Sequence, residues 1–410
     1  MTGAAYFTGP RAAVLLAALF AISVFAQIDR ILPFILAEAI KAELALSDTQ
    51  VGLVTGLAFA VCYTLLLLPL ARLADRGSPR AVLVGCTLVW SAMTALGGAA
   101  TGFAFLALTR IGVAVGEAGA VPSAHALIAR RIAPERRGLA IGIFSMGIPL
   151  GAMAGFALGG AVSDAWGWRT ALVGAGMLGV LVALFALAAA GPTLPEPGAG
   201  RPPYLRESLR LLAAPAFRWL FAGAIATGFA AAPFYAFVAP FLIRVHGFSA
   251  TEAGLAFGGL QGLMGIAGTL LGGRAYDRAA RAGRHHLRGP AMLFGLAAVT
   301  TTAALLAPDS TMAVALLAPA MFAFTYVLPH AFGTAHLLAG PGREAMASSL
   351  ILIGTGLVGP ALGPLIVGLV SDAAAGAGLP RGLALGLMIV PLASALAALA
   401  CRAADRRIAA

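Results

Sequence analysis

Long apolar runs separated by short charged connectors make up nearly the whole chain. Most runs are about 20 to 30 residues long, enough for a helix to cross the hydrocarbon core of a bilayer. No β-type alternation competes with this pattern, and in lipid only helices or closed barrels satisfy every backbone polar group. The pattern therefore predicts an all-α membrane protein with twelve transmembrane helices. The expected spans are about 11–37, 50–72, 80–101, 103–131, 137–163, 168–190, 217–244, 251–273, 289–307, 310–338, 344–371 and 381–401.

The composition and the placement of charge support a multi-pass membrane protein. Hydrophobic residues make up 60% of the chain and charged residues 10%, whereas a soluble domain needs about 25% charged residues to cover its surface. The net charge of +11 is concentrated in the connectors that face the cytoplasm if the N-terminus does. We therefore expect an inner (plasma) membrane protein with both termini cytoplasmic. The first apolar run is too long for a signal peptide, whose apolar segment is about 7–15 residues, so we expect it to be retained.

Several other classes of protein are excluded by what the sequence contains. The three cysteines, Cys62, Cys86 and Cys401, are far apart and suggest neither a disulfide framework nor a metal site. The stretch Gly354-Thr-Gly356-Leu-Val-Gly359 matches a dinucleotide-binding pattern, but it lies inside an apolar run with no preceding strand. We find no nucleophile–base arrangement. We expect no enzyme activity, no cofactor, no metal and no nucleic-acid partner.

The chain contains an internal repeat. Ala71-Arg-Leu-Ala-Asp75-Arg76 recurs as Gly273-Arg-Ala-Tyr-Asp277-Arg278, and Ser163-Asp164 after the fifth run recurs as Ser371-Asp372 after the eleventh. The repeat predicts two six-helix bundles, at 1–190 and 217–410, related by a pseudo-twofold axis along the membrane normal, which is an arrangement found in transporters. Residues 191–216 form the expected cytoplasmic linker, whose stretch from Tyr204 predicts an amphipathic helix on the membrane surface.

Twelve spans in two halves, with a Gly/Ala-x-x-x-Asp-Arg connector after spans two and eight, resemble the major facilitator superfamily. The resemblance implies the major facilitator fold and rocker-switch alternating access. It also implies that the two connectors act as cytoplasmic gating latches, through Asp75, Arg76, Asp277 and Arg278; the alternative is that these charges form solvated surface pairs. Spans five and eleven are rich in glycine and proline, and the resemblance implies that such runs lie between the two halves.

Four stretches are similar to the spinster subgroup of that superfamily. They are Gln27-Ile-Asp29-Arg30, Ser47-Asp-Thr-Gln-Val-Gly-Leu, Arg110-Ile-Gly-Val-Ala-Val-Gly-Glu117-Ala-Gly and Trp166-Gly-Trp168-Arg169. The resemblance implies transport of an amphipathic lipid, such as a lysophospholipid or a sphingoid phosphate. We expect the protein to be a monomer in membrane lipid. A multidrug or small organic anion transporter of the same fold is the first alternative. A receptor or scaffold that does not transport is the second.

Ionisable residues inside the spans are candidate functional groups, because each is costly to bury in lipid. Asp29 in span one and Arg110 in span four are expected at equal depth, and Glu117 lies two turns beyond Arg110 on the same helix face. We expect Asp29 to pair with Arg110, and protonation of Asp29 to release Arg110 for an anionic head group or for Glu117. Protons would then be the coupling ion. The alternative is a static ion pair that only fixes helix packing. Arg30 points about 100° away from Asp29 and either reaches the interface or pairs elsewhere.

The second half has no acid inside a span, so its candidate substrate contacts are uncharged or histidine. Together with Arg110 and Glu117 we expect Tyr235, Gln261, Tyr326 and His330 to contact substrate; His336 is a weaker candidate. Nearby aromatic residues would suit an apolar tail, although each could instead face lipid or a neighbouring helix. They are Phe234, Phe237, Phe241, Phe322 and Phe324. His330 could titrate, or could simply be packed and hydrogen-bonded.

Overall fold

The computed structural model describes residues 6–133, 136–191, 204–282, 287–340, 344–379 and 381–409. These residues fold almost entirely as helices, with no β-strand among them. Twelve helical segments are long and apolar enough to cross a membrane, so the prediction of twelve spans is confirmed. They begin at Gly9, Asp48, Pro79, Phe103, Ile143, Trp168, Pro215, Ala250, Arg288, Ser310, Ala347 and Gly382. The protein is an integral, multi-pass membrane protein.

The helices belong to two compact units. Unit 1 comprises Met1–Leu46, Ala58–Gly200 and Ser249–Gly258, and unit 2 comprises Ser47–Leu57, Arg201–Phe248 and Gly259–Ala410. Two short segments thus lie in the unit built mainly by the opposite half of the chain. Residues 47–57 precede the predicted linker but belong to unit 2, and residues 249–258 follow the linker but belong to unit 1.

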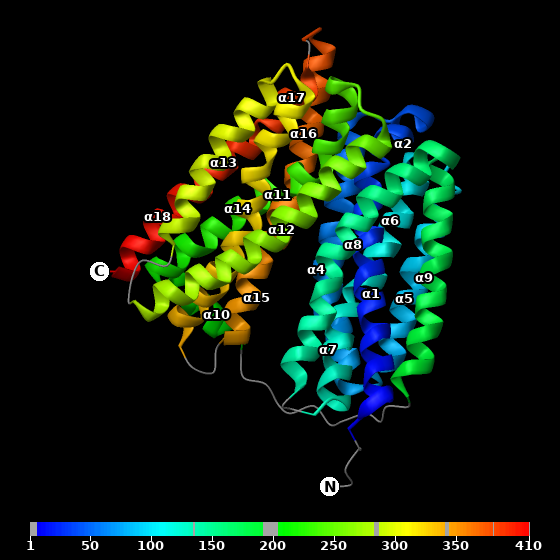
Figure 1. The fold of residues 1–410 in the computed structure, drawn as a ribbon, viewed down its shortest axis with the longest axis vertical. Helices are drawn as coiled ribbons and strands as arrows, with labels where there is room; N and C mark the ends of the chain where they lie inside the picture. The colour runs from blue at the N-terminus through cyan, green and yellow to red at the C-terminus, as the bar shows by residue number, and fades with distance from the viewer. Residues whose placement is uncertain are drawn as a thin grey trace. The chain divides into compact units, whose positions relative to one another are not determined.

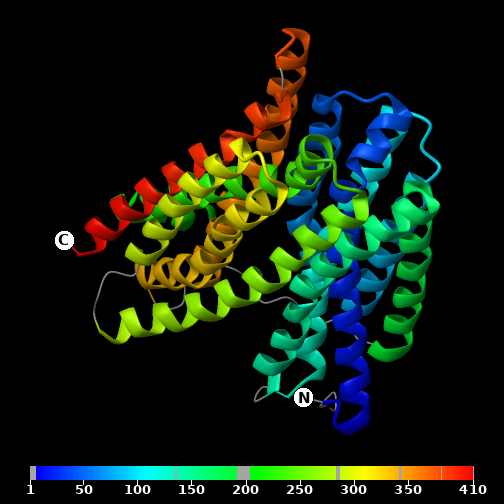
Figure 2. The ribbon, with the colours of Figure 1, turned by 45° about the horizontal axis from the view of Figure 1, so that its top comes forward.

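Unit 1 is a bundle of long helices (Figure 1). Helix α1 packs against α8 and α9, and α5 packs against α6 and α9; Figure 2 shows α1 and α8 side by side. The helices are α1 (Gly9–Ile35), α2 (Ala37–Leu44), α4 (Ala58–Arg76), α5 (Pro79–Gly97), α6 (Phe103–Ala118), α7 (Ala120–Arg131), α8 (Arg137–Trp166) and α9 (Trp168–Ala190).

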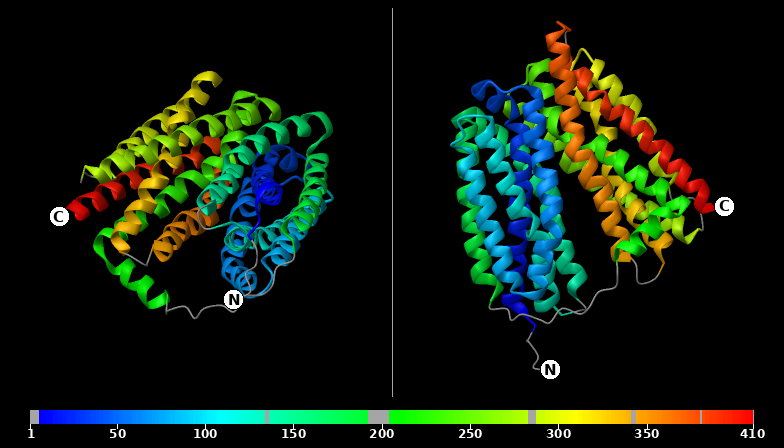
Figure 3. Two further views of the ribbon diagram at one scale, coloured as in Figure 1. Left: turned by 60° about the horizontal axis from the view of Figure 1, so that its bottom comes forward. Right: turned by 180° about the vertical axis from the view of Figure 1, so that it is seen from behind.

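In unit 2, α11 packs along α18 and α13 packs against both α14 and α18, as Figure 3 shows for α11 and α18. Short π-helical turns, η1 and η3, interrupt spans two and eleven. The elements are α3 (Asp48–Gly52), η1 (Leu53–Leu57), α10 (Tyr204–Ala213), α11 (Pro215–His246), α12 (Ala250–Arg281), α13 (Arg288–Leu306), α14 (Ser310–Ala339), α15 (Glu344–Ile353), η3 (Gly354–Val358), α16 (Gly359–Gly376), α17 (Gly382–Leu387) and α18 (Ile389–Ala409). The first turns of α12 belong to unit 1. The helix expected from Tyr204 is α10; most of the linker before it lies outside the described residues.

The glycines of span five pack mainly against α1, within one half of the chain, whereas the resemblance implied a place between the halves; Gly160 alone among those described lies against the second half, at the backbone of Ala250. Gly147 faces Ser23, Gly151 faces Val24 and Gly155 faces Ile31, all on α1; an added Cβ would clash at the first two and would be tight at Gly155. Span eleven behaves alike in unit 2, where Gly359 lies against the backbone of Gly228 on α11. Most of these small residues therefore bring helices of one unit close together.

Candidate functional site

Three of the predicted charged residues are buried together in unit 1. Asp29 on α1, Arg110 on α6 and Glu117 on α6 are 1%, 6% and 2% exposed. Arg110 and Glu117 lie on one face of α6 because seven residues are close to two helical turns. The structure therefore brings the predicted residues into one cluster.

The expected pairing of Asp29 with Arg110 is wrong in detail. Arg110 Nη1 donates a hydrogen bond to the backbone oxygen of Asp29, at 3.4 Å, and not to its carboxylate. The carboxylate instead faces the Thr94 hydroxyl and the Trp90 indole N–H on α5. Among the described residues, neither carboxylate oxygen completes a hydrogen bond, and neither do those two donors. The Asp29 carboxylate thus faces donors of α5, and Arg110 contacts Asp29 by hydrogen bond only through the backbone.

Arg30 forms the ion pair of this cluster. Its Nη2 and Nε atoms lie 2.6 Å and 3.1 Å from Oε2 of Glu117. The side chain of Arg30 is 37% exposed, whereas that of Glu117 is 1% exposed. Because Arg30 leaves α1 about 100° from Asp29, it reaches the deeper acid on α6. Arg30 was the residue whose partner the sequence left open.

Two aromatic side chains of α4 complete the cluster, and sequence analysis missed both. The guanidinium carbon of Arg30 lies 5.2 Å from the ring centroids of Phe59 and Tyr63, and that of Arg110 lies 5.3 Å from Phe59. Such cation–π contacts stabilise a buried guanidinium. The available signal was the spacing of Phe59 and Tyr63, four residues apart on one face of span two.

The polar candidates of unit 2 form two separate groups. The Tyr235 hydroxyl contacts Sδ of Met321 at 3.3 Å and interacts with Gln261. One turn further along α14, the Tyr326 ring stacks on His330 with centroids 4.8 Å apart. Nδ1 of His330 lies 3.1 Å from the Tyr326 backbone oxygen, so His330 is packed and hydrogen-bonded, as one of the two interpretations expected.

Most of the candidate phenylalanines of unit 2 are core residues. Phe234, Phe237 and Phe241 are fully buried and Phe324 is 4% exposed, and Phe234 packs edge-on against Phe324. They therefore fill the space between helices. Phe322 is only partly buried and lies against Tyr326, with ring centroids 5.5 Å apart. His336 contacts the Ser348 hydroxyl at 2.6 Å.

The predicted gating residues remain predictions. The side chains of Asp75 and Arg76 lie outside the described part of the structure. Asp277 and Arg278 are exposed on α12. The Asp277 backbone oxygen accepts a hydrogen bond from Arg281 at 3.2 Å, and its carboxylate forms no ion pair with the side chains that the structure describes.

The Trp168-Arg169 pair of the fourth motif binds Glu43. Trp168 Nε1 and Arg169 Nε donate to the two carboxylate oxygens at 2.6 Å and 2.9 Å. Arg169 also donates to the Gly98 backbone oxygen at 2.8 Å. These contacts attach the end of α2 to the start of α9 within unit 1.

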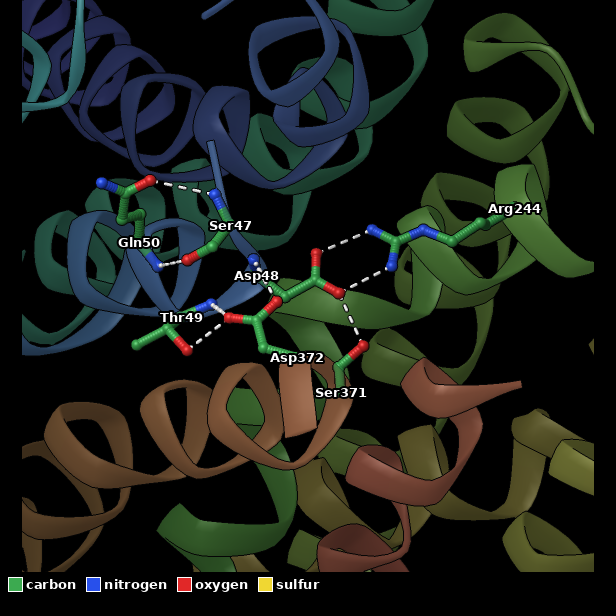
Figure 4. Close-up of polar contacts among 7 residues, drawn as sticks. All are labelled: Ser47, Asp48, Thr49, Gln50, Arg244, Ser371 and Asp372. Carbon is green, nitrogen blue, oxygen red and sulfur yellow. Dashed lines mark hydrogen bonds and ion pairs between the residues drawn. The ribbon is translucent and has the colours of Figure 1, made fainter. Parts of the chain in front are cut away.

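The repeated Ser-Asp pair of span eleven contacts the start of span two in unit 2 (Figure 4). Asp372 accepts hydrogen bonds from the backbone N–H groups of Asp48 and Thr49, at 2.9 Å and 2.8 Å. Asp48 forms an ion pair with Arg244 at 2.7 Å. Sequence analysis noticed the repeat but missed both Asp48 and Arg244, which look like ordinary connector charges.

Two units of membrane-spanning helices, with a cluster of buried charges in one of them, define a membrane transporter. The chain belongs to the Major Facilitator Superfamily, whose family model matches residues 14–364. The family indicates a transporter and not an enzyme.

The chain is similar to several individual transporters of known sequence or structure. The chain is 36% identical, over 84% of its length and 81% of the relative's, to an MFS-type efflux pump of Mycolicibacterium smegmatis. Crystal structures of a bacterial homologue of the human lysosomal transporter Spinster, inward-facing, match with TM-scores of 0.84 (unoccupied) and 0.82 (occupied). Both are 28% identical and cover 98% of this chain, with 99% and 97% of the matched chains covered. The resemblance to the spinster subgroup is thereby confirmed. A nucleoside transporter, 16% identical with a TM-score of 0.75 over 95% of this chain and 99% of its own, shares the fold.

Proposed function

We propose that the protein is a proton-coupled secondary active transporter that works by rocker-switch alternating access. The observation that carries this proposal is the buried Asp29 carboxylate, which completes no hydrogen bond with the described residues. A buried, unsatisfied carboxylate is costly. A proton that neutralises Asp29 removes the cost of burying its charge, so binding and release of a proton here is linked to the arrangement of α1, α5 and α6.

Protonation of Asp29 would change the balance of charge in the cluster. With all groups ionised, Asp29 and Glu117 balance Arg30 and Arg110. Because Arg30 already holds Glu117 at 2.6 Å, protonation of Asp29 leaves Arg110 with the uncompensated positive charge. An anionic group would then be attracted to Arg110, which links the proton to the substrate by electrostatics.

The substrate class proposed is an amphipathic, lipid-like molecule with an anionic head group, such as a lysophospholipid or sphingoid phosphate. The guanidinium groups suit the head group, and the Spinster-type neighbours support this subgroup. We infer that Tyr235, Gln261, Tyr326 and His330 contact the rest of the molecule from unit 2. The second candidate is efflux of drug-like or small organic anions, which the 36% identical efflux pump favours.

The remaining features of the proposal are its orientation in the membrane, its gate and its oligomeric state. Both termini face the cytoplasm of a cell whose inner (plasma) membrane holds the protein, since the arginine-rich connectors lie on that side. The Asp-Arg connectors after spans two and eight form the cytoplasmic gate in another state of the transport cycle. The protein acts as a monomer.

Flux measured in proteoliposomes tests the proposal. We expect uptake of labelled lysolipid that depends on an imposed pH gradient, is outcompeted by other lysolipids and resists small organic anions. The reverse order of competition would favour the second candidate. Binding without flux would support a receptor.

The matched variant is Asp29→Asn, which keeps the shape of the side chain but cannot take up and release a proton. We expect it to bind substrate and to lose flux driven by the pH gradient. Undiminished pH-driven flux in Asp29→Asn would exclude Asp29 from coupling.

A further inference from the structure

Four buried polar atoms face one another between α1 and α5 of unit 1. They are the two carboxylate oxygens of Asp29, the indole nitrogen of Trp90 and the hydroxyl oxygen of Thr94, and none of them completes a hydrogen bond with the described residues. The three residues are 1%, 0% and 4% exposed. Each unsatisfied polar group in such a place costs about 1–3 kcal/mol. Because two acceptors face two donors, a small approach of Asp29 to α5 would satisfy all four.

Arg110 does not replace these donors, because a proline gives it another acceptor. Pro33 lies four residues after Asp29 inside α1. A proline has no N–H, so the backbone oxygen of Asp29 lacks its usual donor within the helix. Arg110 Nη1 donates to this oxygen at 3.4 Å. The guanidinium is therefore bonded to the backbone of α1, and the carboxylate is left to the donors of α5.

The two donors belong to a helix that glycines hold closely from two sides. A Cβ added to Gly116 on α6 would lie 2.6 Å from the backbone nitrogen of Trp90. A Cβ added to Gly176 on α9 would lie 2.5 Å from the backbone oxygen of Ser91. Close contacts of this kind fix a helix against its neighbours. Trp90 and Thr94 are four residues apart and share one face of α5, so they present two fixed donors to α1.

The charged groups that act on this carboxylate lie on α6. They are Arg110 and Glu117, and Glu117 is itself bound to Arg30. On α5 the sequence has a charged residue only in the first turn, Arg80. The other helices that pack most against α1 carry titratable residues only near their ends: α8 and α9 in their end turns, α7 in its last two turns, and α2 beyond the end of α1. Proton binding at Asp29 therefore responds to two charges of α6 and two donors of α5.

We propose that Trp90 and Thr94 are positioning residues that bind the ionised carboxylate of Asp29 and release the protonated acid. A hydrogen bond to a carboxylate is roughly twice as strong as one between neutral groups. Loss of the proton therefore draws Asp29 to α5, and gain of the proton lets it leave. The proposal rests on the proposed function, in which this proton drives transport, and it names the groups that receive the ionised acid.

The test observes the indole N–H of Trp90 directly, without substrate or a pH gradient. The full chain is labelled with ¹⁵N at its four tryptophans and studied by NMR in lipid nanodiscs. The Trp90 signal is the one that Trp90→Phe removes; if Trp90→Phe does not fold, the signal is assigned in a chain whose other tryptophans are replaced by phenylalanine. We expect the Trp90 proton signal to move downfield as the pH rises, because the indole begins to donate to a carboxylate. In Asp29→Asn the signal should not titrate. A Trp90 signal that is independent of pH, or that titrates unchanged in Asp29→Asn, would overturn the proposal.

Thr94→Val separates the hydroxyl from the shape of the side chain. It removes one donor to the ionised acid, so we expect the midpoint of the Trp90 titration to move to higher pH, with the proton bound about tenfold more tightly, which corresponds to about 1.4 kcal/mol. Thr94→Ser keeps the hydroxyl and should restore the wild-type midpoint. The matched control is Thr87→Val, also buried on α5, because the Thr87 hydroxyl donates to the Leu83 backbone oxygen at 2.7 Å.

An unchanged midpoint in Thr94→Val, or an equal shift in Thr87→Val, would exclude a role for the Thr94 hydroxyl. If Thr94→Val does not fold, Thr94→Cys is judged by the same criterion, because its S–H group is a weak donor of similar size.

Flux by the wild-type protein distinguishes this proposal from the proposed function. If pH-driven flux is present and is lost in Asp29→Asn, but the Trp90 signal does not titrate, only the roles of Trp90 and Thr94 fail. If the signal titrates through Asp29 and shifts in Thr94→Val, but the wild type shows no pH-driven flux, proton coupling fails and the positioning role stands.

Discussion

The interiors of the two units differ although the chain repeats itself. Unit 1 buries Asp29, Arg110 and Glu117 and adds the half-exposed Arg30. The four candidate substrate contacts of unit 2 are two phenols, an amide and a histidine. Of these, Gln261 is 9% exposed and His330 is 2% exposed. A repeat can therefore preserve the helices while the interior chemistry of its copies diverges.

The difference indicates a division of labour. Charged groups respond strongly to a proton in a low-dielectric interior, whereas stacked phenol and imidazole rings mainly provide shape. On the proposed function, unit 1 carries the proton coupling and attracts the head group, and unit 2 contacts the rest of the substrate. The predictions below test that division, starting with the largest expected effect.

The strongest test compares Asp29→Asn with His330→Gln. We expect Asp29→Asn to reduce pH-driven flux in proteoliposomes to the level of protein-free liposomes, because the ionisable group is gone. His330→Gln should keep the dependence on the pH gradient, because His330 is held by Tyr326 through stacking and its Nδ1 contact. Loss of pH dependence in His330→Gln, with Asp29→Asn unaffected, would reverse the division between units.

The second test concerns the stability of the charged cluster. Arg30→Ala should lower the free energy of unfolding by about 3 kcal/mol, because it leaves the buried Glu117 without its ion-pair partner. Glu117→Ala should cost about 1–2 kcal/mol, since Arg30 is 37% exposed and can turn towards water. Denaturant unfolding in detergent micelles measures both. If Glu117→Ala lowered the free energy of unfolding more than Arg30→Ala, the prediction would be wrong, and Arg30 could not turn towards water when its partner is removed.

A third test probes the close packing of unit 2 with neighbouring glycines. A Cβ on Gly272 would lie about 3.0 Å from Cα of Tyr326 and closer still to its backbone oxygen, whereas a Cβ on Gly273 meets nothing described within 4 Å. Gly272→Ala should therefore destabilise the protein by about 1–3 kcal/mol. Gly273→Ala is the matched control and should gain up to about 1 kcal/mol from helix propensity. Equal unfolding midpoints would show that α12 and α14 separate easily.

The spans and the buried acids were predictable from the sequence for physical reasons. Lipid requires long apolar helices, so each span is visible as a run of residues. An acid inside such a run is conspicuous, which is why Asp29 and Glu117 were found. Their partners were not predictable in the same way. Which side chain meets which depends on helix rotation and tilt, and Arg30, not Arg110, reaches Glu117.

The contacts at the ends of spans were the least predictable. Asp48 and Arg244 lie 196 residues apart and have the same appearance as the charges that end any membrane helix. The repeated Ser-Asp pairs were visible, but only the structure shows that Asp372 and Asp164 cap other helices. Charged residues are common at the ends of membrane helices, so the sequence alone does not show which of them form a pair.

The smallest expected effect concerns an exposed carboxylate of unit 1, in contrast to its buried cluster. The hydrogen bond from the Trp168 indole, and then that from the Arg169 guanidinium, lower the pKa of Glu43 below its usual value. A carboxyl with a lower pKa in the folded chain stabilises the fold above its unfolded pKa, about 4.3, and this contribution is lost as the pH falls through the folded value.

The melting temperature of Glu43→Gln should therefore fall less steeply between pH 6 and pH 3 than that of the wild type. Arg169→Gln should flatten the curve less than Glu43→Gln, because the Trp168 bond has the larger influence on the pKa. If the melting temperature of Glu43→Gln changed with pH as steeply as that of the wild type, water would screen these bonds fully. Packing alone would then hold α2 to α9. The contrast between exposed and buried charge in unit 1 would be larger than we propose.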